Sequence, residues 1–191
     1  MIAGHIITRF KNNTAVLSLI AINEKAKTTG NQPPLHISGK GLNIKKAVNQ
    51  FFEEQELPYE KVGNTFFADK LTIINSDFFK VSVDEIGHID FIYDRACLVA
   101  LPPQLRAKYL EKIDELLPFG SQQFINTLEY YPTKLEPPFS IQPKEVIDYF
   151  ESSHTIEHVE CQNVENHGLK RAWKLDYVKE HGFIATKNKG I

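Results

Sequence analysis

The sequence has few of the features that mark several common protein classes. Its 191 residues include only two cysteines, Cys97 and Cys161, too few for a disulfide framework. No apolar run approaches the roughly 20 residues that a membrane-spanning helix needs. The formal net charge of −2 gives no general attraction to nucleic acids or anionic lipids. Residues 1–10 show no signal-peptide pattern. We therefore expect a cytoplasmic protein without a nucleic-acid or membrane partner.

The composition is that of an ordinary globular domain. Hydrophobic residues make up 42% of the chain and charged residues 24%. The length suits one domain over residues 1–191 and allows a sizeable core.

Hydrophobic periodicity predicts strands that alternate with helices. The run Ala15–Ile22 fits either a strand or a buried helical turn, and residues 25–40 are expected to be a loop. The further expected strands are 71–74, 89–93, 124–130, 155–159 and 177–186. The expected helices are 43–57, 102–117 and 143–150, with a short polar helix before the last strand. This alternation predicts an α/β sheet that is mostly parallel and has an antiparallel C-terminal edge.

Polar side chains follow three of the expected strands. They are Ser76 and Asp77 after the first, Asp94 and Arg95 after the second, and residues 129–131 after the third. Ligands of open parallel sheets bind beyond the carboxyl ends of the strands. Arg95 has a planar fork that could hold a carboxylate in two hydrogen bonds, with Asp94 fixing its orientation. A structural salt bridge at the strand end is the alternative.

The segment from Ile92 to Pro103, Ile-Tyr-Asp-Arg-Ala-Cys-Leu-Val-Ala-Leu-Pro-Pro, resembles the signature of the thiopurine S-methyltransferase family. Further motifs follow the family in the same order. They are Ala47–Gln55, Ser76–Phe79, Leu116–Pro118, Thr127–Tyr130 and Pro137–Ser140. The resemblance covers about residues 44–187, so residues 43–187 are family-like and residues 1–42 are divergent.

The resemblance implies a Rossmann-like methyltransferase that uses S-adenosylmethionine (SAM) as its cofactor. It implies methyl transfer to a small-molecule thiol, such as an aromatic thiopurine, or to a related selenium or tellurium compound. Carried over by motif, Arg95 would be the catalytic residue and would contact the methionine end of the cofactor. Ser76 and Asp77 would lie beside the adenine, and Pro138 and Phe139 would shape the substrate side. No metal site is expected.

The N-terminal region departs from the family pattern. The family's Leu-Cys-Gly-Lys-like loop is absent, and Gly41 or Leu42 occupies the position of the acidic residue that holds the cofactor ribose. We therefore expect a sheet that is incomplete at the N-terminus. The chain would be a monomer, or an oligomer if a sheet edge is exposed. Loss of the first strand would cause low stability or oligomer formation unless Ala15–Ile22 replaces that strand. One hypothesis is a shifted reading frame or an altered start before residue 42. The alternative function is a non-catalytic remnant without a competent SAM site.

Other candidate residues have structural explanations. His154 and His158 would lie about 13 Å apart on a strand, too far to share a metal ion. Cys97 lies in an apolar segment, which favours a buried thiol over a nucleophile. Trp173 and the pair Lys170–Arg171 could flank the substrate pocket or form a solvated helix face.

Overall fold

A computed structural model describes residues 5–10, 13–20, 48–49, 52–53, 56–68, 71–87, 89, 91–95 and 97–188. For residues 5–10, 13–20 and 71 it describes the backbone. The predicted loop at 25–40, and most of the predicted helix at 43–57, lie outside the described residues. Residues 48, 49, 52 and 53 of that segment are helical.

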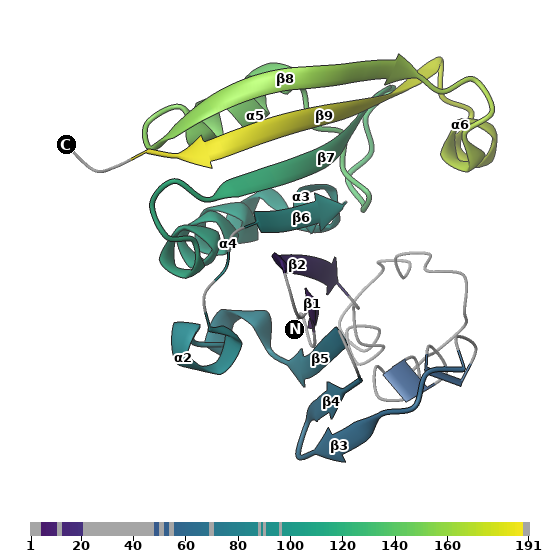
Figure 1. Cartoon of the computed structure of the whole chain (residues 1–191). Helices are drawn as coiled ribbons and strands as arrows, with labels where there is room; N and C mark the ends of the chain where they lie inside the picture. Colours follow the sequence, from purple (N-terminus) through teal and green to yellow (C-terminus); the bar gives the residue numbers. More distant parts are fainter. Residues whose placement is uncertain are drawn as a thin grey trace.

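The nine described strands form one sheet in the order β3-β4-β5-β1-β2-β6-β7-β9-β8 (Figure 1). Their bounds are β1 His5–Phe10, β2 Asn13–Ile20, β3 Glu60–Val62, β4 Thr65–Phe67, β5 Leu71–Ser76, β6 Phe91–Arg95, β7 Gln122–Tyr131, β8 His154–Asn163 and β9 Tyr177–Lys187. Among these strands, β2 pairs with β6 and β6 with β7 in parallel, and the other pairs are antiparallel.

The sheet is therefore mixed rather than mostly parallel. The predicted antiparallel C-terminal edge is present, because β9 pairs antiparallel with both β7 and β8. A second antiparallel region, β3-β4-β5-β1, was not predicted. Its members β1, β3 and β4 lie where the hydrophobic periodicity is weak, and strands of three residues such as β3 and β4 carry little pattern.

β2 lies in the middle of the sheet, next to β6. Its residues Ala15–Ser18 pair in parallel with Phe91–Asp94 of β6. Of the two alternatives for Ala15–Ile22, the strand is thus correct. This strand fills the central position whose loss would have exposed the edges of its neighbours.

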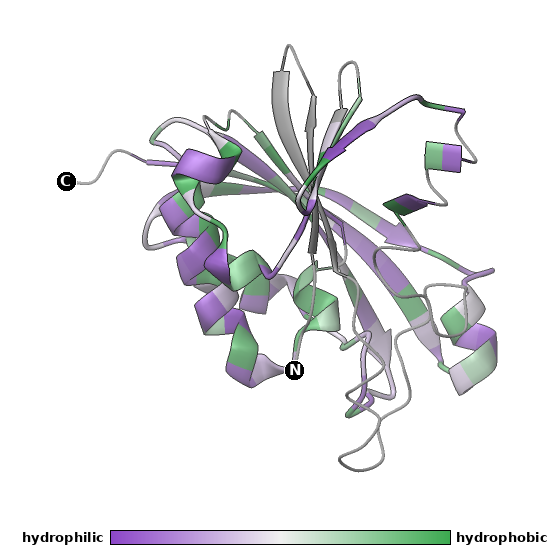
Figure 2. Cartoon of the chain, turned by 90° about the horizontal axis from the view of Figure 1, so that it is seen from below, coloured by the Kyte–Doolittle hydropathy of each residue, from purple (hydrophilic) through white to green (hydrophobic). Residues whose placement is uncertain are grey.

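The helices explain how the sheet is covered. They are η2 Phe78–Lys80, α2 Val83–Ile86, α3 Cys97–Ala100, α4 Pro103–Leu116, α5 Pro143–Phe150 and α6 Gly168–Trp173. α4 buries Arg106, Tyr109, Ile113 and Leu116, a spacing that places them on one face. Figure 2 shows apolar and polar segments alternating along the helices, as expected when one side packs on a sheet. The main core lies beneath α3, α4 and α5.

Most element predictions in the C-terminal two-thirds are confirmed, but several strand ends differ. β5 includes Ser76, and β8 runs from His154 to Asn163 rather than over 155–159. Asp94 and Arg95 are the last two residues of β6 rather than the residues after it. Glu129, Tyr130 and Tyr131 lie inside β7. Both strands continue because their neighbours supply backbone partners: Arg95 pairs with Asn126, and β9 pairs with β7 out to Tyr131. In the described part of the chain, no helix has the length and apolarity needed to cross a membrane.

Candidate active site

The predicted cofactor-binding residues lie at one edge of the sheet. β2, β6 and β7 run in the same direction, and β5 shares it because β5 and β2 are both antiparallel to β1. Ser76 ends β5 and Arg95 ends β6. The carboxyl ends of these strands therefore meet at one edge, as a Rossmann-like ligand site requires.

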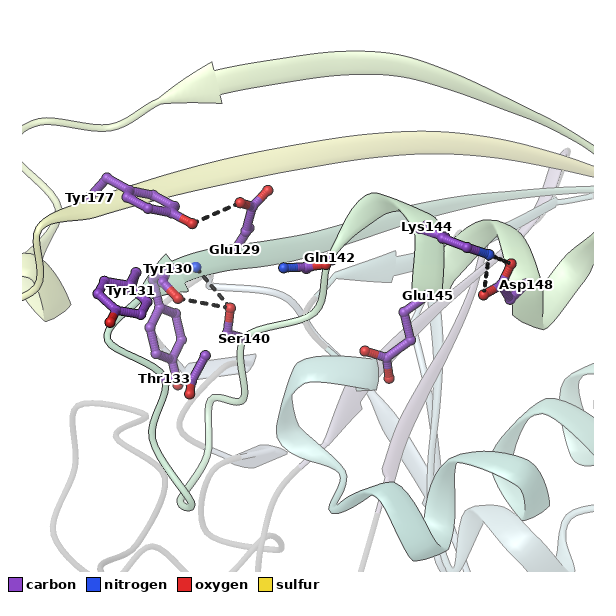
Figure 3. Close-up of a pocket in the computed structure, with 10 residues that line it drawn as sticks. All are labelled: Glu129, Tyr130, Tyr131, Thr133, Ser140, Gln142, Lys144, Glu145, Asp148 and Tyr177. Atoms are coloured by element: carbon purple, nitrogen blue, oxygen red, sulfur yellow. Dashed lines mark hydrogen bonds and ion pairs between the residues drawn. The ribbon is translucent and has the colours of Figure 1, made fainter.

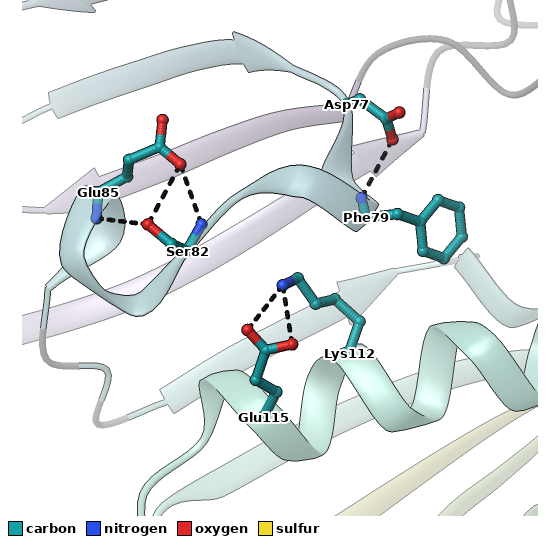
Figure 4. Close-up of polar contacts among 6 residues, drawn as sticks. All are labelled: Asp77, Phe79, Ser82, Glu85, Lys112 and Glu115. Carbon is teal, nitrogen blue, oxygen red and sulfur yellow. Dashed lines mark hydrogen bonds and ion pairs between the residues drawn. The ribbon is translucent and has the colours of Figure 1, made fainter.

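Asp77 begins the short helix η2 directly after β5 (Figure 4). One of its carboxylate oxygens accepts a hydrogen bond from the backbone N–H of Phe79 at 3.1 Å. The other carboxylate oxygen lies 3.7 Å from the Lys80 ammonium. Asp77 and Ser76 are both half-buried. The capping bond fixes the direction of the Asp77 carboxylate, which leaves it able to accept a further hydrogen bond from a ligand.

The Arg95 side chain is exposed and forms no hydrogen bond or ion pair with the described part of the chain. The prediction that Asp94 orients Arg95 is wrong. Both oxygens of the Asp94 carboxylate are used elsewhere: one accepts from the Cys97 backbone N–H at 2.9 Å, and the other from the Tyr109 hydroxyl at 2.9 Å. Successive residues of a strand point to opposite faces, so Asp94 is buried while Arg95 faces outward.

Asp94 instead fixes the turn that presents Arg95. Asp94 and Tyr109 are wholly buried. Burial raises the pKa of the Asp94 carboxyl, and the bonds from Cys97 and Tyr109 offset part of that rise. Burial, followed by the charge of Asp94, raises the pKa of the Tyr109 hydroxyl well above its ordinary value. Tyr109 also packs its ring on Phe78, at 5.3 Å between centroids, so it connects the segments after β5 and β6.

The loop between β7 and α5 carries the predicted substrate residues Pro138 and Phe139. The Tyr130 hydroxyl donates to the Pro138 carbonyl at 2.6 Å, and the Phe139 N–H donates to the carbonyl of Val99 in α3. The guanidinium of Arg106 lies 5.7 Å from the Phe139 ring centroid. The loop is therefore bonded to the helix that follows Arg95, and the structure brings the two predicted parts of the site together.

The same loop takes the place of β6 beyond the end of that strand. Ile141 N–H donates to the Leu128 carbonyl, and the Ser140 hydroxyl accepts from the Tyr130 N–H at 2.8 Å. The Ser140 hydroxyl also donates to the Tyr130 carbonyl. These bonds satisfy backbone groups of β7 that β6 is too short to reach.

A polar cavity of about 380 Å³ lies between this loop, α5 and the start of β9 (Figure 3). It is lined by Glu129, Tyr130, Tyr131, Thr133, Ser140, Gln142, Lys144, Glu145, Asp148 and Tyr177. Tyr130 and Ser140 belong both to the cavity wall and to the contacts that hold the substrate loop. The cavity therefore adjoins the predicted substrate side.

A chain of hydrogen bonds beside this cavity was missed by sequence reasoning. The Tyr177 hydroxyl donates to Glu129 at 2.9 Å, and His181 Nε2 lies 3.0 Å from the other Glu129 oxygen. His181 Nδ1 lies 3.1 Å from Nε2 of His158. The four residues come from three strands, and their pairing depends on register. Sequence reasoning singled out Glu129 only as a polar residue near a strand end, and His158 only as a metal-ligand candidate with His154.

The remaining candidates have structural roles. His154 is buried, with Nδ1 2.8 Å from the Ser153 hydroxyl, whereas His158 contacts His181. Cys97 is buried, as predicted. Trp173 packs its edge on Tyr130, with 5.7 Å between ring centroids.

The pair Lys170–Arg171 fits the alternative of a solvated helix face, because Lys170 is half-buried and Arg171 is exposed. The ammonium of Lys170 lies 2.6 Å from the Glu165 carboxylate, and Arg171 donates to the Asn166 carbonyl.

The chain matches the family described as Thiopurine S-methyltransferase (TPMT) over residues 17–188. It is similar to the thiopurine S-methyltransferase of Pseudomonas fluorescens (strain SBW25), with 36% identity over 146 residues. That match covers 74% of this chain and 65% of the relative. The match to the thiopurine S-methyltransferase of Shewanella woodyi (strain ATCC 51908 / MS32) has 38% identity and covers 55% of this chain and 53% of the relative. The chain thus spans between about half and two-thirds of the relatives' length.

Among solved structures, TehB from Haemophilus influenzae matches with a TM-score of 0.48 and 13% sequence identity. The match covers 76% of this chain and 48% of TehB.

Proposed function

Because the chain belongs to the thiopurine S-methyltransferase family, we propose that it transfers a methyl group from SAM to the sulfur of a small-molecule thiol. One observation carries the proposal: the family match covers residues 17–188. This range contains Ser76, Asp77, Arg95, Pro138 and Phe139, the residues proposed here for the site. It also contains the second half of β2, Leu17–Ile20, the strand next to Arg95's own strand.

The side chains at the sheet edge fit the chemistry of SAM. Adenine offers N–H donors, and the half-buried Asp77 carboxylate keeps acceptor capacity after capping η2. The methionine end carries a carboxylate, and Arg95 is an exposed guanidinium without a partner among the described residues. We therefore assign Ser76 and Asp77 to the adenine end and Arg95 to the methionine end. The position of the ribose acid, residue 41 or 42, lies outside the described residues.

When bound, SAM supplies an electrophilic methyl group on a sulfonium that is already activated as a leaving group. The protein's task is alignment, which can contribute on the order of 7–11 kcal/mol when the reacting atoms are well placed. Arg95 contributes by holding a carboxylate at a fixed point beyond β6. Asp94 and Tyr109 act through Arg95, because they fix the turn from which it extends.

Pro138 and Phe139 form the proposed acceptor side. Phe139 is held by its backbone bond to Val99 and by the guanidinium of Arg106 over its ring. Arg106 is itself buried, donates to the Leu101 carbonyl and pairs with Glu145. A fixed aromatic ring at the edge of the site suits stacking of a flat heterocyclic thiol and helps to exclude water.

The proposal extends to the methyl acceptor, the domain organisation, the compartment and the oligomeric state. We propose an aromatic thiol such as a thiopurine, or a selenium or tellurium compound, as the acceptor. We also propose a single methyltransferase-like domain over residues 1–191 that acts in the cytoplasm as a monomer. The family match begins at residue 17, inside the region 1–42 that is expected to be divergent.

Isothermal titration with S-adenosylhomocysteine tests the cofactor assignment. We expect micromolar binding by the wild type and a loss of about 10- to 100-fold in Arg95→Ala, which corresponds to one charge-assisted contact. Arg171→Ala is the matched control, because Arg171 is another exposed arginine, and its affinity should stay within about twofold. No binding by a folded wild type would refute the proposal and indicate the non-catalytic remnant. An equal loss of affinity in both variants would refute the role of Arg95 but not the proposed SAM binding.

A further inference from the structure

Two histidines form a direct contact between the last two strands of the sheet. His181 of β9 is 2% exposed, and its Nδ1 lies 3.1 Å from Nε2 of His158 on β8. The ring of His158 stacks on Phe183 with 4.5 Å between centroids and 16° between ring planes. His158 is therefore held between Phe183 and His181, although its outer side faces solvent.

The partners of His181 decide which nitrogen carries its proton. The Glu129 carboxylate accepts from the Tyr177 hydroxyl through one oxygen and lies 3.0 Å from His181 Nε2 through the other. An ionised carboxylate only accepts hydrogen bonds, so Nε2 of His181 carries the hydrogen. In neutral His181, Nδ1 is then a lone pair, and His158 donates to it from Nε2.

The contact between His158 and His181 tolerates some protonation states of the two rings and not others. With one added proton the contact survives, because one ring still offers a lone pair to the N–H of the other. With both rings protonated, two N–H groups face each other at 3.1 Å without an acceptor, and two positive charges are adjacent. The contact is compatible with the neutral and singly protonated states and incompatible with the doubly protonated one.

Other charged groups surround the pair. On β9, the Lys179 ammonium lies over the Tyr177 ring and opposes protonation of His181, whereas Glu129 on β7 favours it. On α5, which packs on β8, the groups that line the cavity with Glu129 are Lys144, Glu145 and Asp148. Lys144 forms an ion pair with Asp148, and Glu145 forms one with Arg106, so the charges of these α5 groups are largely neutralised by their partners.

The contact between His158 and His181 lies beside an irregularity in the backbone pairing of β8 with β9. Among the described strands, β8 pairs with β9 alone and forms the edge of the sheet. Its register with β9 shifts between His158 and Glu160, so the ladder is interrupted beside the histidine pair. A side-chain contact at this point holds the edge strand where the backbone bonds do not.

We propose that His158 and His181 form a proton-sensitive latch between β8 and β9, which opens when both rings are protonated. Opening of the latch also affects the cavity. α6 is the element that follows β8 in the chain, and Trp173 of α6 packs on Tyr130 in the cavity wall. Acidification therefore loosens β8 and one wall of the cavity while the Glu129–His181 pair remains intact.

Amide hydrogen exchange of the full chain at pH 7.5 and pH 5.0 tests the latch, with rates corrected for the intrinsic effect of pH. We expect β8 amides to lose at least about tenfold in protection on acidification while β7 amides keep theirs. His158→Gln keeps a side-chain donor that does not titrate, and the acid loss should fall at least about fivefold. Unchanged β8 protection in the wild type, or the same loss in His158→Gln, would overturn the proposal.

An NMR titration of the histidine rings in the wild type does not depend on the variant folding. We expect the pKa of His181 in the wild type to lie below the ordinary histidine value of about 6.5, because the ring is buried. In His158→Gln the pKa of His181 should rise, because a neighbouring positive charge is gone. A pKa of His181 at the ordinary value in the wild type, or one that does not change in His158→Gln, would refute the latch.

Discussion

Substitutions at Asp94 and Tyr109 should destabilise the protein in an order set by hydrogen-bond matching. The buried Asp94 carboxylate accepts from two donors, the Cys97 N–H and the Tyr109 hydroxyl. Asp94→Ala removes both acceptors. At about 1–3 kcal/mol for each buried donor left without a partner, the loss is about 2–6 kcal/mol. Tyr109→Phe removes one bond to a charged group and should cost about 1.5–3 kcal/mol.

Asp94→Asn should be the mildest change, at most about 1 kcal/mol at neutral pH. The amide oxygen can accept from Cys97, and the amide nitrogen can donate to the Tyr109 oxygen, because a hydroxyl also accepts. The neutral amide also avoids the desolvation that raises the pKa of Asp94. A group whose folded-state pKa is raised stabilises below its unfolded pKa, and that contribution is lost as pH rises through the folded pKa. As the pH falls toward about 4, the free energy of unfolding of the wild type should therefore increase relative to that of Asp94→Asn.

Urea unfolding of the four proteins at pH 7.5 and pH 5 measures the series. For a domain of this size, each kcal/mol corresponds to a melting shift of about 2–4 °C. S-adenosylhomocysteine affinity of Tyr109→Phe, measured in parallel, reports how well the turn before Arg95 is held. If Asp94→Asn is as damaging as Asp94→Ala, the negative charge itself is required, and the hydrogen-bond reasoning is wrong.

Three further changes test other parts of the structure. Gly182→Ala should cost about 1–3 kcal/mol in urea unfolding, because an added Cβ would lie 3.2 Å from the Phe124 ring; a neutral result would mean that the ring moves freely. Arg106→Leu should cost about 1–3 kcal/mol, since it removes the guanidinium that donates to the Leu101 carbonyl and pairs with the partly exposed Glu145, and the variant should also bind an aromatic thiol more weakly; unchanged stability would contradict these contacts. Burial lowers the pKa of His154 and of His181, so the unfolded chain binds more protons and stability should fall as the pH drops below about 6.5; melting temperatures equal at pH 7.5 and pH 5.5 would contradict this.

The sequence identified elements whose signals are local. α4 begins at Pro103 and buries residues at helical spacing, and α5 begins at Pro143, so a capping signal and periodicity were enough for both. β5 and β7 carry uninterrupted apolar or alternating patterns. The ends of the strands were not identified from the sequence. Asp94 and Arg95 are polar, which predicts the end of a strand, although their backbones pair with β7.

The amino-acid order alone determined the family, the C-terminal succession of strands and helices, and the position of Ser76, Asp77 and Arg95 near strand ends. These are properties of motifs and of local periodicity. Tertiary structure alone decided that β2 fills the centre of the sheet and that Asp94 turns inward to Tyr109, away from Arg95. It also brought His158 to His181 across two strands. Such pairings depend on register and on which face of a strand is buried, and neither is recorded in the sequence of a single strand.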